Sequence, residues 1–153
     1  MSHSVTIQTR TVTTGSPSSI NVGFCKSWAG LLKIAQVVVG LVVVLLVLYG
    51  RNEKWINNLD IFLMLVAFAF MLGTAIFIIS YFFSPVSEPI IGKTNYDIIY
   101  NGSAVLLLLI GSIVSLSESN PKNSVTLLLA GVFGLIMALL YAASLGFLIR
   151  RKI

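Results

Sequence analysis

The 153-residue chain is 57% hydrophobic and only 10% charged, and its mean hydropathy is +0.98. About a quarter of the residues in a soluble domain are charged, so this composition excludes an ordinary soluble domain and indicates a membrane protein. The net charge of +5 would suggest a nucleic-acid partner in a soluble protein, but in a membrane protein it reports orientation, and we expect no nucleic-acid partner.

Four stretches without any Asp, Glu, Lys or Arg dominate the chain: 34–50, 61–87, 98–117 and 123–149. A helix needs about 20 apolar residues to cross the bilayer, and these runs are not the short alternating segments of a membrane β-barrel. We therefore predict an all-α membrane protein, an antiparallel bundle of four transmembrane helices over about 29–50, 61–83, 97–116 and 125–149. The short connectors leave no room for a second domain, so 21–150 forms one domain.

The chain opens with a Ser/Thr-rich segment, 1–20, that offers almost nothing to bury. We predict a disordered cytosolic tail here, and the single histidine, His3, lies in it. With one histidine the chain cannot assemble a histidine-based metal cluster, so no metal and no cofactor is expected. The first apolar run is too long for a signal peptide and lacks a cleavage site, so we expect it to stay in the mature protein.

Residues 21–36 lead into the first helix. Trp28 suits the headgroup level, and Lys26 and Lys33 can run their stems through the apolar layer while their ammonium groups stay in water. We interpret these three residues as interfacial anchors. The alternative is an amphipathic cytosolic helix that senses a lipid or a partner.

Cys25 is the only cysteine, so an intrachain disulfide is excluded. It lies beside Lys26 and close to a transmembrane helix, the position at which reversible palmitoylation occurs. An unmodified thiol at the interface is the alternative.

Asp97 stands at the start of the third helix. A carboxylate there complements the positive end of the helix dipole, and Lys93, four residues earlier, is its expected partner. Asn101-Gly-Ser103 is formally a glycosylation sequon, but we expect it at the cytosolic end of the helix, where glycosylation does not occur.

The fourth helix carries small residues at every fourth position, which allow another backbone to approach closely: Ala130, Gly134, Ala138, Ala142 and Gly146. We interpret them as helix-packing residues within the bundle. Association of two copies of the chain through the same face is the alternative.

The basic residues indicate the orientation. With a cytosolic amino-terminal end, the cytosolic face receives seven of them and the other face three. The positive-inside rule then predicts both termini in the cytosol. Residues 151–153 form a short basic cytosolic tail. Arg151 and Lys152 in this tail, together with Arg150 just before it, are expected to anchor the last helix at the membrane surface.

The apolar stretches contain no ionisable residue, whereas carriers and proton relays usually retain such residues in the membrane. No nucleophile, base and oxyanion donor converge in the sequence, and no glycine loop suits a phosphate, so we expect no enzyme. A small pore or carrier, or an accessory subunit of a membrane or junctional complex, remains the alternative to a membrane-organising protein.

Several short patterns resemble the MARVEL domain of the MAL, plasmolipin and chemokine-like-factor group. They are Asn21-x-Gly23-x-x-Lys26 with Gly30-Leu-Leu-Lys33-x-x-Gln36, Asp97-x-x-Tyr100-Asn101, and Tyr141-Ala-Ala-Ser144-x-x-Phe147. The start of the chain is also similar to small insect members of the Singles bar type.

The resemblance implies a tetraspan protein that works with membrane lipids at cholesterol-rich domains, in vesicle trafficking, membrane apposition or cell fusion such as myoblast fusion. It implies residence in the plasma membrane or in trafficking vesicles, homo-oligomers or other membrane proteins as partners, and no reaction.

Overall fold

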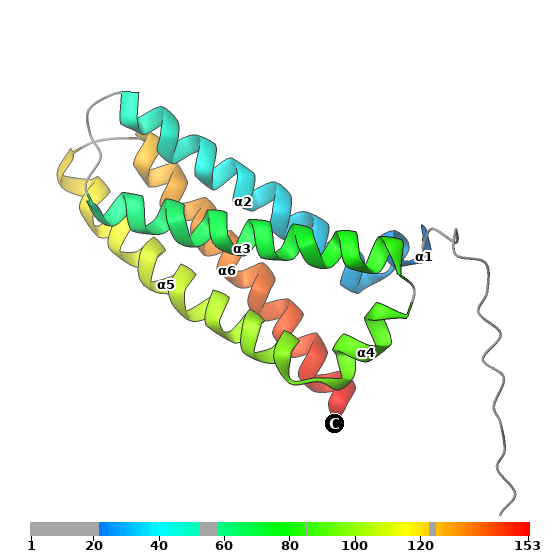
Figure 1. The fold of residues 1–153 in the computed structure, drawn as a ribbon. Coiled ribbons are helices and arrows are strands. Elements are labelled where there is room, and N and C mark those ends of the chain that lie inside the picture. Colours follow the sequence, from blue (N-terminus) through cyan, green and yellow to red (C-terminus); the bar gives the residue numbers. More distant parts are fainter. Residues whose placement is uncertain (1–21, 53–57, 85, 123–124) are drawn as a thin grey trace, which may run out of the picture.

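The computed structural model describes residues 22–52, 58–84, 86–122 and 125–153. The described chain forms helices only (Figure 1): α1 (Val22–Lys26), α2 (Trp28–Asn52), α3 (Asn58–Phe83), α4 (Ser87–Lys93), α5 (Tyr96–Lys122) and α6 (Val125–Lys152). The predicted tail, 1–20, lies outside the described residues.

Four of these helices are long and apolar enough to cross a membrane: 28–50, 58–83, 96–117 and 125–152. The prediction of an all-helical bundle with four transmembrane helices is therefore confirmed. The helices extend past the charge-free stretches on which the prediction rested, most clearly α5, which runs to Lys122. A helix satisfies its own backbone hydrogen bonds, so it can continue into the headgroup region after the apolar residues end.

The long helices form a ring in the order α2, α3, α5, α6, with α6 closing back on α2. Each helix runs antiparallel to both of its neighbours in this ring (Figure 1). The starts of α2 and α5 and the ends of α3 and α6 therefore lie at one end of the bundle. We refer to it as the α4 end, because α4 links α3 to α5 there.

The core of the ring is apolar and closely packed. Val43, Leu63, Ala104, Leu108 and Met137 have no measurable exposure. Lipid offers no hydrophobic driving force between helices, so close van der Waals contact has to hold them together. Small residues permit that contact: a Cβ on Gly134 would collide with the Ser112 hydroxyl of α5, and one on Gly131 would lie 2.7 Å from Leu116 Cγ.

The small-residue face of α6 divides into two parts. Ala130, Gly134 and Ala138 are buried within the bundle. Gly146 is exposed, and a Cβ added to it would meet nothing within 4 Å. The first part therefore packs inside one chain, and association of two copies through α6 stays a prediction.

The outer surface of the long helices carries large apolar side chains. Leu65 and Ile76 of α3 are 57% and 63% exposed, Leu106 of α5 is 64% exposed, and Leu139 of α6 is 67% exposed. Side chains of this kind face the acyl chains when a bundle crosses a bilayer. Large apolar side chains thus face outward from the bundle, whereas polar side chains such as Gln36, Thr74 and Asn101 are buried inside it.

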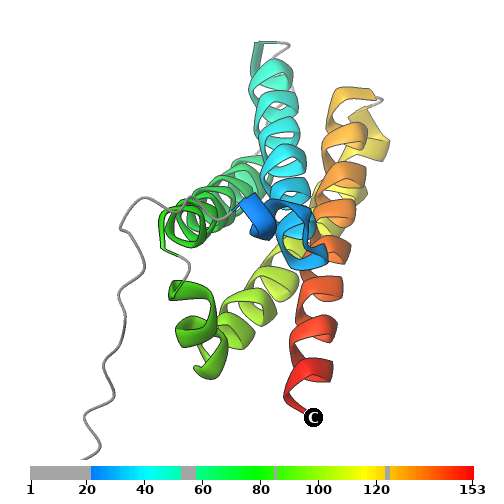
Figure 2. The ribbon, with the colours of Figure 1, turned by 90° about the vertical axis from the view of Figure 1, so that its right-hand side faces the viewer.

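Two short helices, α1 and α4, complete the α4 end; the sequence offered a helix within 21–36 only as an alternative and did not predict α4. Figure 2, which looks onto this end, shows α1 across the start of α2 and α4 between α3 and α5. At the turn after α1, the Ser27 hydroxyl donates to the Phe24 carbonyl at 2.7 Å and accepts from the Gly30 amide at 3.1 Å. Gly30 is needed here, because a Cβ would collide with the Phe24 carbonyl oxygen.

Both ends of the described chain, Val22 and Ile153, lie at the α4 end of the bundle, because the four long helices alternate in direction, and we predict that this end faces one side of the membrane. That this side is the cytosol stays a prediction. In a Cys25→Ser background, we expect Ile153→Cys, whose site is fully exposed, to react with an impermeant maleimide only after the plasma membrane is permeabilised. Labelling in intact cells would reverse the orientation.

Glycosylation at Asn101 cannot report this orientation. The Asn101 side chain is fully buried, and its amide nitrogen donates to Asp97. We therefore expect no glycan there whichever side the α4 end faces.

Candidate functional site

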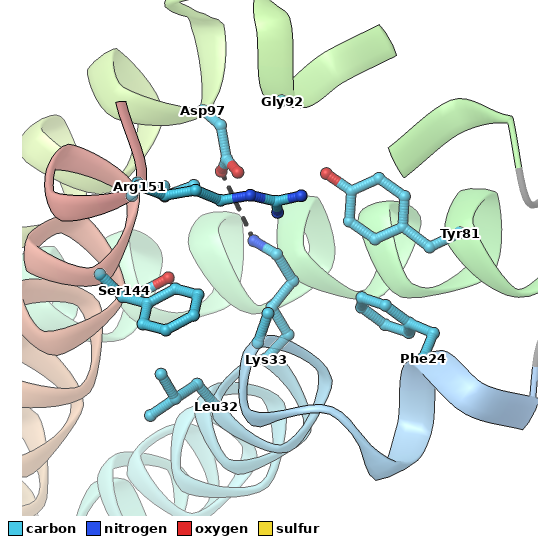
Figure 3. A pocket seen from close by; sticks show the side chains of 11 residues that line it. Phe24, Leu32, Lys33, Tyr81, Gly92, Asp97, Ser144 and Arg151 are labelled. Atoms are coloured by element: carbon cyan, nitrogen blue, oxygen red, sulfur yellow. Dashed lines mark ion pairs between the residues drawn. The ribbon is translucent and has the colours of Figure 1, made fainter. Parts of the chain in front are cut away.

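A buried ion pair joins α2 to α5 near the α4 end of the bundle (Figure 3). Lys33 Nζ lies 3.5 Å from Asp97 Oδ1, and the two side chains are only 5% and 7% exposed. Both residues belong to helices that can span the membrane. Ionisable groups at such positions are costly to bury and are functional candidates by default.

Asn101 holds the carboxylate of this pair in place. Its Nδ2 donates to Asp97 Oδ1 at 2.8 Å and to the Asp97 backbone carbonyl at 2.6 Å, one helical turn away. Asp97 also lies in the first turn of α5, where a negative charge interacts favourably with the helix dipole. The Asp97 carboxylate therefore interacts with the Lys33 ammonium group, the Asn101 amide and the positive end of the α5 dipole.

Aromatic rings enclose the ammonium group of Lys33. Its Nζ lies 5.0 Å from the ring centroid of Phe77, a distance at which a cation interacts with an aromatic face. Phe24 of α1 and Tyr81 of α3 pack with their centroids 5.0 Å apart on the same side of the cavity (Figure 3). α1 thus covers the ion pair on the side that faces the α4 end of the bundle.

A cavity of about 30 Å³ lies beside the ion pair, lined by residues from every helix of the described chain. Lys33 Nζ makes no hydrogen bond in the structure. An ammonium group has three donors, and the cavity is large enough for a single water molecule. We expect an ordered water there, bridging Lys33 to neighbouring polar atoms.

A second polar layer lies deeper in the bundle and joins α3, α5 and α6. The Thr74 hydroxyl is 2.6 Å from the Tyr141 hydroxyl and 3.2 Å from the Tyr100 hydroxyl. Both tyrosines donate to the Phe70 carbonyl, at 2.8 Å from Tyr100 and 3.0 Å from Tyr141. A Cβ on Gly73 would collide with the Tyr100 hydroxyl, so the glycine makes room for this layer.

Gln36 provides a contact between α2 and α6 close to the second layer. Its Nε2 donates to the Leu140 carbonyl at 3.3 Å, and its side chain is fully buried. Directional bonds therefore connect all four long helices near the α4 end. Hydrogen bonds between membrane helices each contribute about 0.6 kcal/mol on average and up to about 2 kcal/mol.

Thr74→Val tests the second layer. The valine keeps the shape but loses the hydroxyl that Tyr100 and Tyr141 share, while each tyrosine keeps its bond to Phe70. We expect the free energy of unfolding in mixed micelles to fall by about 0.5–1.5 kcal/mol. Ser103→Ala is the control, because that hydroxyl bonds only within its own helix, to Ile99. An equal loss in both variants would contradict a layer that couples helices.

The structure corrects two expectations. Lys33 was predicted to keep its ammonium group in water as an anchor, but its side chain turns into the bundle. The expected pairing of Asp97 with Lys93 is not found, because Lys33 takes that place and Lys93 is exposed. The charge-free stretches begin just after Lys33 and Asp97, whereas the helices begin before them, so both residues fall inside spanning helices.

Asp60 is the third buried charged residue of the described chain, and it lies inside a candidate span at the opposite end of the bundle. Asp60, in the first turn of α3, is 1% exposed and accepts a hydrogen bond from the Ser115 hydroxyl at 2.9 Å. The apolar stretches themselves contain no charged residue, but the candidate spans extend past them and so include Lys33, Asp60 and Asp97, together with Arg150, Arg151 and Lys152 at the end of α6.

The other predicted site residues lie outside the two polar layers, which are the Lys33–Asp97 ion pair and the Thr74 layer, or only border them. Cys25 is a half-buried free thiol on α1, and its palmitoylation stays a prediction. Lys26, Trp28, Arg150 and Lys152 are exposed near the α4 end, as anchors must be, although anchoring itself stays a prediction. Arg151 lines the cavity beside the ion pair. Within the described ranges, no group of three His, Cys, Asp or Glu side chains could hold a metal ion.

The residue patterns on which the family resemblance rests meet at the α4 end. Gly30, Lys33 and Gln36 come from α2, Tyr100 and Asn101 follow Asp97 on α5, and Tyr141 and Ser144 come from α6. Apart from Gly30, which packs against Phe24 and Ser27, all of them make or border the two polar layers. Each pattern alone is a few polar residues in an apolar helix, so the sequence does not show that the patterns lie close together in the fold.

Comparison with known proteins gives one family. The MARVEL family, described as a membrane-associating domain, matches residues 24–147, which is most of the chain and includes both polar layers. No curated protein and no solved structure matches the chain. Members of the family are generally non-enzymatic membrane proteins. With four candidate spans and this match, the chain is a multi-pass membrane protein that belongs to the MARVEL family.

Proposed function

We propose that this protein is a non-enzymatic organiser of membrane microdomains that acts in vesicle trafficking, membrane apposition or cell fusion. The observation that carries the proposal is the outer surface of the bundle. Large apolar side chains point outward from the spanning helices, among them Leu65, Ile76, Leu106 and Leu139, while the polar side chains of the two layers point inward.

This distribution favours work through lipid and helix contacts. The connectors between the long helices are short in sequence, so the surfaces available to partners are the lipid-facing helices and the ends of the chain. Membership of a membrane-associating family supports the same role. The proposal includes a location in the plasma membrane or trafficking vesicles, cytosolic chain ends, and contact with cholesterol-rich membrane or with other copies of the chain.

Reconstitution tests the lipid-organising part directly. The purified full chain is placed in giant vesicles that separate into ordered and disordered phases, and its partition and the domain size are measured. We expect partition into one phase and a change in domain size. A variant with Leu65, Ile76 and Leu106 replaced by alanine removes outward volume only, so it should fold but lose the phase preference. Unchanged partition in this variant would contradict the proposal.

Cells test the biological part. Removing the protein from cells that express it should impair delivery of a plasma-membrane cargo or cell fusion, and the wild-type chain should restore the defect. The alanine variant that loses its phase preference should fail to restore it. Full rescue by that variant would separate the cellular role from lipid contact and favour an accessory subunit of a membrane complex.

One observation favours a small pore or carrier as the second candidate. Lys33 and Asp97 form an ion pair inside spanning helices, as polar pathways often contain. The cavity beside the pair is only about 30 Å³, and the second layer lies between it and the centre of the bundle. We expect no reproducible ion-selective current from the purified chain in planar bilayers, and such a current would replace the first proposal with this one.

A further inference from the structure

A second cavity, of about 220 Å³, lies outside the polar cluster, between α4 and the end of α6. We call it the basic pocket. Its described lining is formed by Pro89, Gly92, Lys93, Leu148, Arg151 and Lys152. Half of these residues are cationic, and they come from two helices, α4 and α6, that are far apart in the sequence but both line this cavity.

The positive charge of the basic pocket is not neutralised by the described residues that line it, none of which is acidic. Asp97 lines the neighbouring cavity and is already paired with Lys33. Arg151 borders both cavities, and its side chain extends from α6 toward the ion pair (Figure 3). An anion is therefore the ligand that this lining would stabilise.

The pocket is also partly preorganised. Lys152 Nζ donates to the Thr94 carbonyl and to Asn95 Oδ1, both at 2.9 Å, and these two bonds tie the end of α6 to the turn between α4 and α5. Gly92 contributes no side chain, and a Cβ there would meet nothing within 4 Å. The two walls of the pocket are thus held together while its interior remains open.

The position of the pocket identifies the source of the anion. Arg151 and Lys152 end a helix that spans the membrane, so their charged groups lie at the level where lipid phosphates are found. Phe147 and Ile149, on the turn of α6 beside the pocket, are 44% and 42% exposed and offer an apolar surface to acyl chains. A lipid satisfies both features, whereas a free phosphate or an acidic peptide uses only the charge.

We infer that the basic pocket binds the phosphate group of an anionic phospholipid from the surrounding leaflet. Lys93 and Arg151 contact the phosphate from opposite walls, Lys152 supports the wall between them, and the acyl chains lie along α6. The inference goes beyond the microdomain role proposed above and does not depend on it, because binding can be measured on the purified chain alone.

Native mass spectrometry of the full chain in detergent tests the inference, with dioleoyl phosphatidylserine as the anionic probe and dioleoyl phosphatidylcholine as the neutral one. We expect tighter binding of phosphatidylserine. Lys93→Gln and Arg151→Gln should each weaken it about fivefold, since a basic residue near an anionic lipid surface contributes about 1 kcal/mol. Both residues are exposed, so an unchanged melting temperature should show that the fold is kept.

Arg150→Gln is the matched control. Arg150 is exposed on the same turn of α6 and carries the same charge, but it does not line the basic pocket. We expect its loss to change phosphatidylserine affinity less than twofold. Equal effects at Arg150 and Arg151 would mean a diffuse charge attraction without a site, and would overturn the inference.

Two competitors distinguish the other sources of negative charge. An excess of inorganic phosphate, or of a short polyglutamate peptide, should leave phosphatidylserine bound. Displacement by phosphate at equal concentration would assign the pocket to a free anion. Tighter binding of the peptide than of the lipid, abolished by Arg151→Gln, would assign it to an acidic protein segment. Either result would overturn the lipid assignment.

Discussion

Lys33→Met should lower the free energy of unfolding by about 3–5 kcal/mol, the usual loss when one partner of a buried ion pair is removed. The Asp97 carboxylate would remain buried without a cationic partner, stabilised by the Asn101 amide and the α5 dipole. The measurement is an SDS titration of the purified chain in mixed micelles, followed by circular dichroism. Lys93→Met is the control, because Lys93 is exposed, and its loss should change the stability by less than about 0.5 kcal/mol.

A double-mutant cycle separates the ion pair from its surroundings. Asp97→Asn alone should also destabilise, since it leaves a buried ammonium without an acid. Lys33→Met with Asp97→Asn removes both charges while keeping an acceptor for Asn101, so the double variant should lose less than the sum of the single losses. We expect a coupling of about 0.5–3 kcal/mol. Strictly additive losses, or equal losses for Lys33→Met and Lys93→Met, would show that the pair is solvated.

Gly134→Ala should be at least about 1–3 kcal/mol more destabilising than Gly146→Ala, as expected for overpacking a close helix contact. Both changes replace glycine by alanine in the same helix, so their effects on the backbone cancel in the comparison. At Gly134 the new Cβ would collide with the Ser112 hydroxyl of α5, whereas at Gly146 it would enter open space.

Ser112→Ala should rescue Gly134→Ala. The Ser112 hydroxyl is buried and has no hydrogen-bond partner in the structure, so its removal alone should be neutral or slightly stabilising. The double variant Gly134→Ala with Ser112→Ala should recover most of the lost stability in the same SDS titration. Crosslinking between copies should be unaffected by Gly134→Ala if this surface packs within one chain. Loss of crosslinking with unchanged stability would instead assign the surface to an oligomer.

The sequence was sufficient for the long helices because each depends on a property of its own residues. A charge-free apolar run such as 34–50, which does not alternate between apolar and polar residues, crosses a bilayer as a helix. The short helices α1 and α4 have 5 and 7 residues, too few for a periodic signal to emerge. The turn at Ser27 depends on the Phe24 carbonyl, which only the folded backbone brings into place.

The candidate site was harder to predict because it depends on which helix faces meet. Lys33 looked like an anchor, since a lysine near the start of a membrane helix can reach water in an isolated span. Asp97 looked like the partner of Lys93, since a spacing of four residues joins side chains within one helix. α4 ends at Lys93 and α5 begins at Tyr96, so that spacing does not apply across the turn.

The small residues of α6 were predicted to pack against another helix, but the sequence did not indicate that this helix is α5. Gly131 is absent from the four-residue series but also packs closely against α5, since an added Cβ would lie 2.7 Å from Leu116 Cγ. A spacing rule selects one line of residues along a helix, whereas the real interface is wider than a line.

The ion pair also has a consequence for the order of events during synthesis. Because the chain is made from its amino-terminal end, the span that carries Lys33 enters the membrane before Asp97 has been translated. Until then the long lysine stem can keep its ammonium group at the bilayer surface. Arrival of α5 supplies the carboxylate, so burial of Lys33 is a late step of assembly, and a chain truncated before α5 should expose this lysine to amine-reactive reagents that the complete bundle excludes.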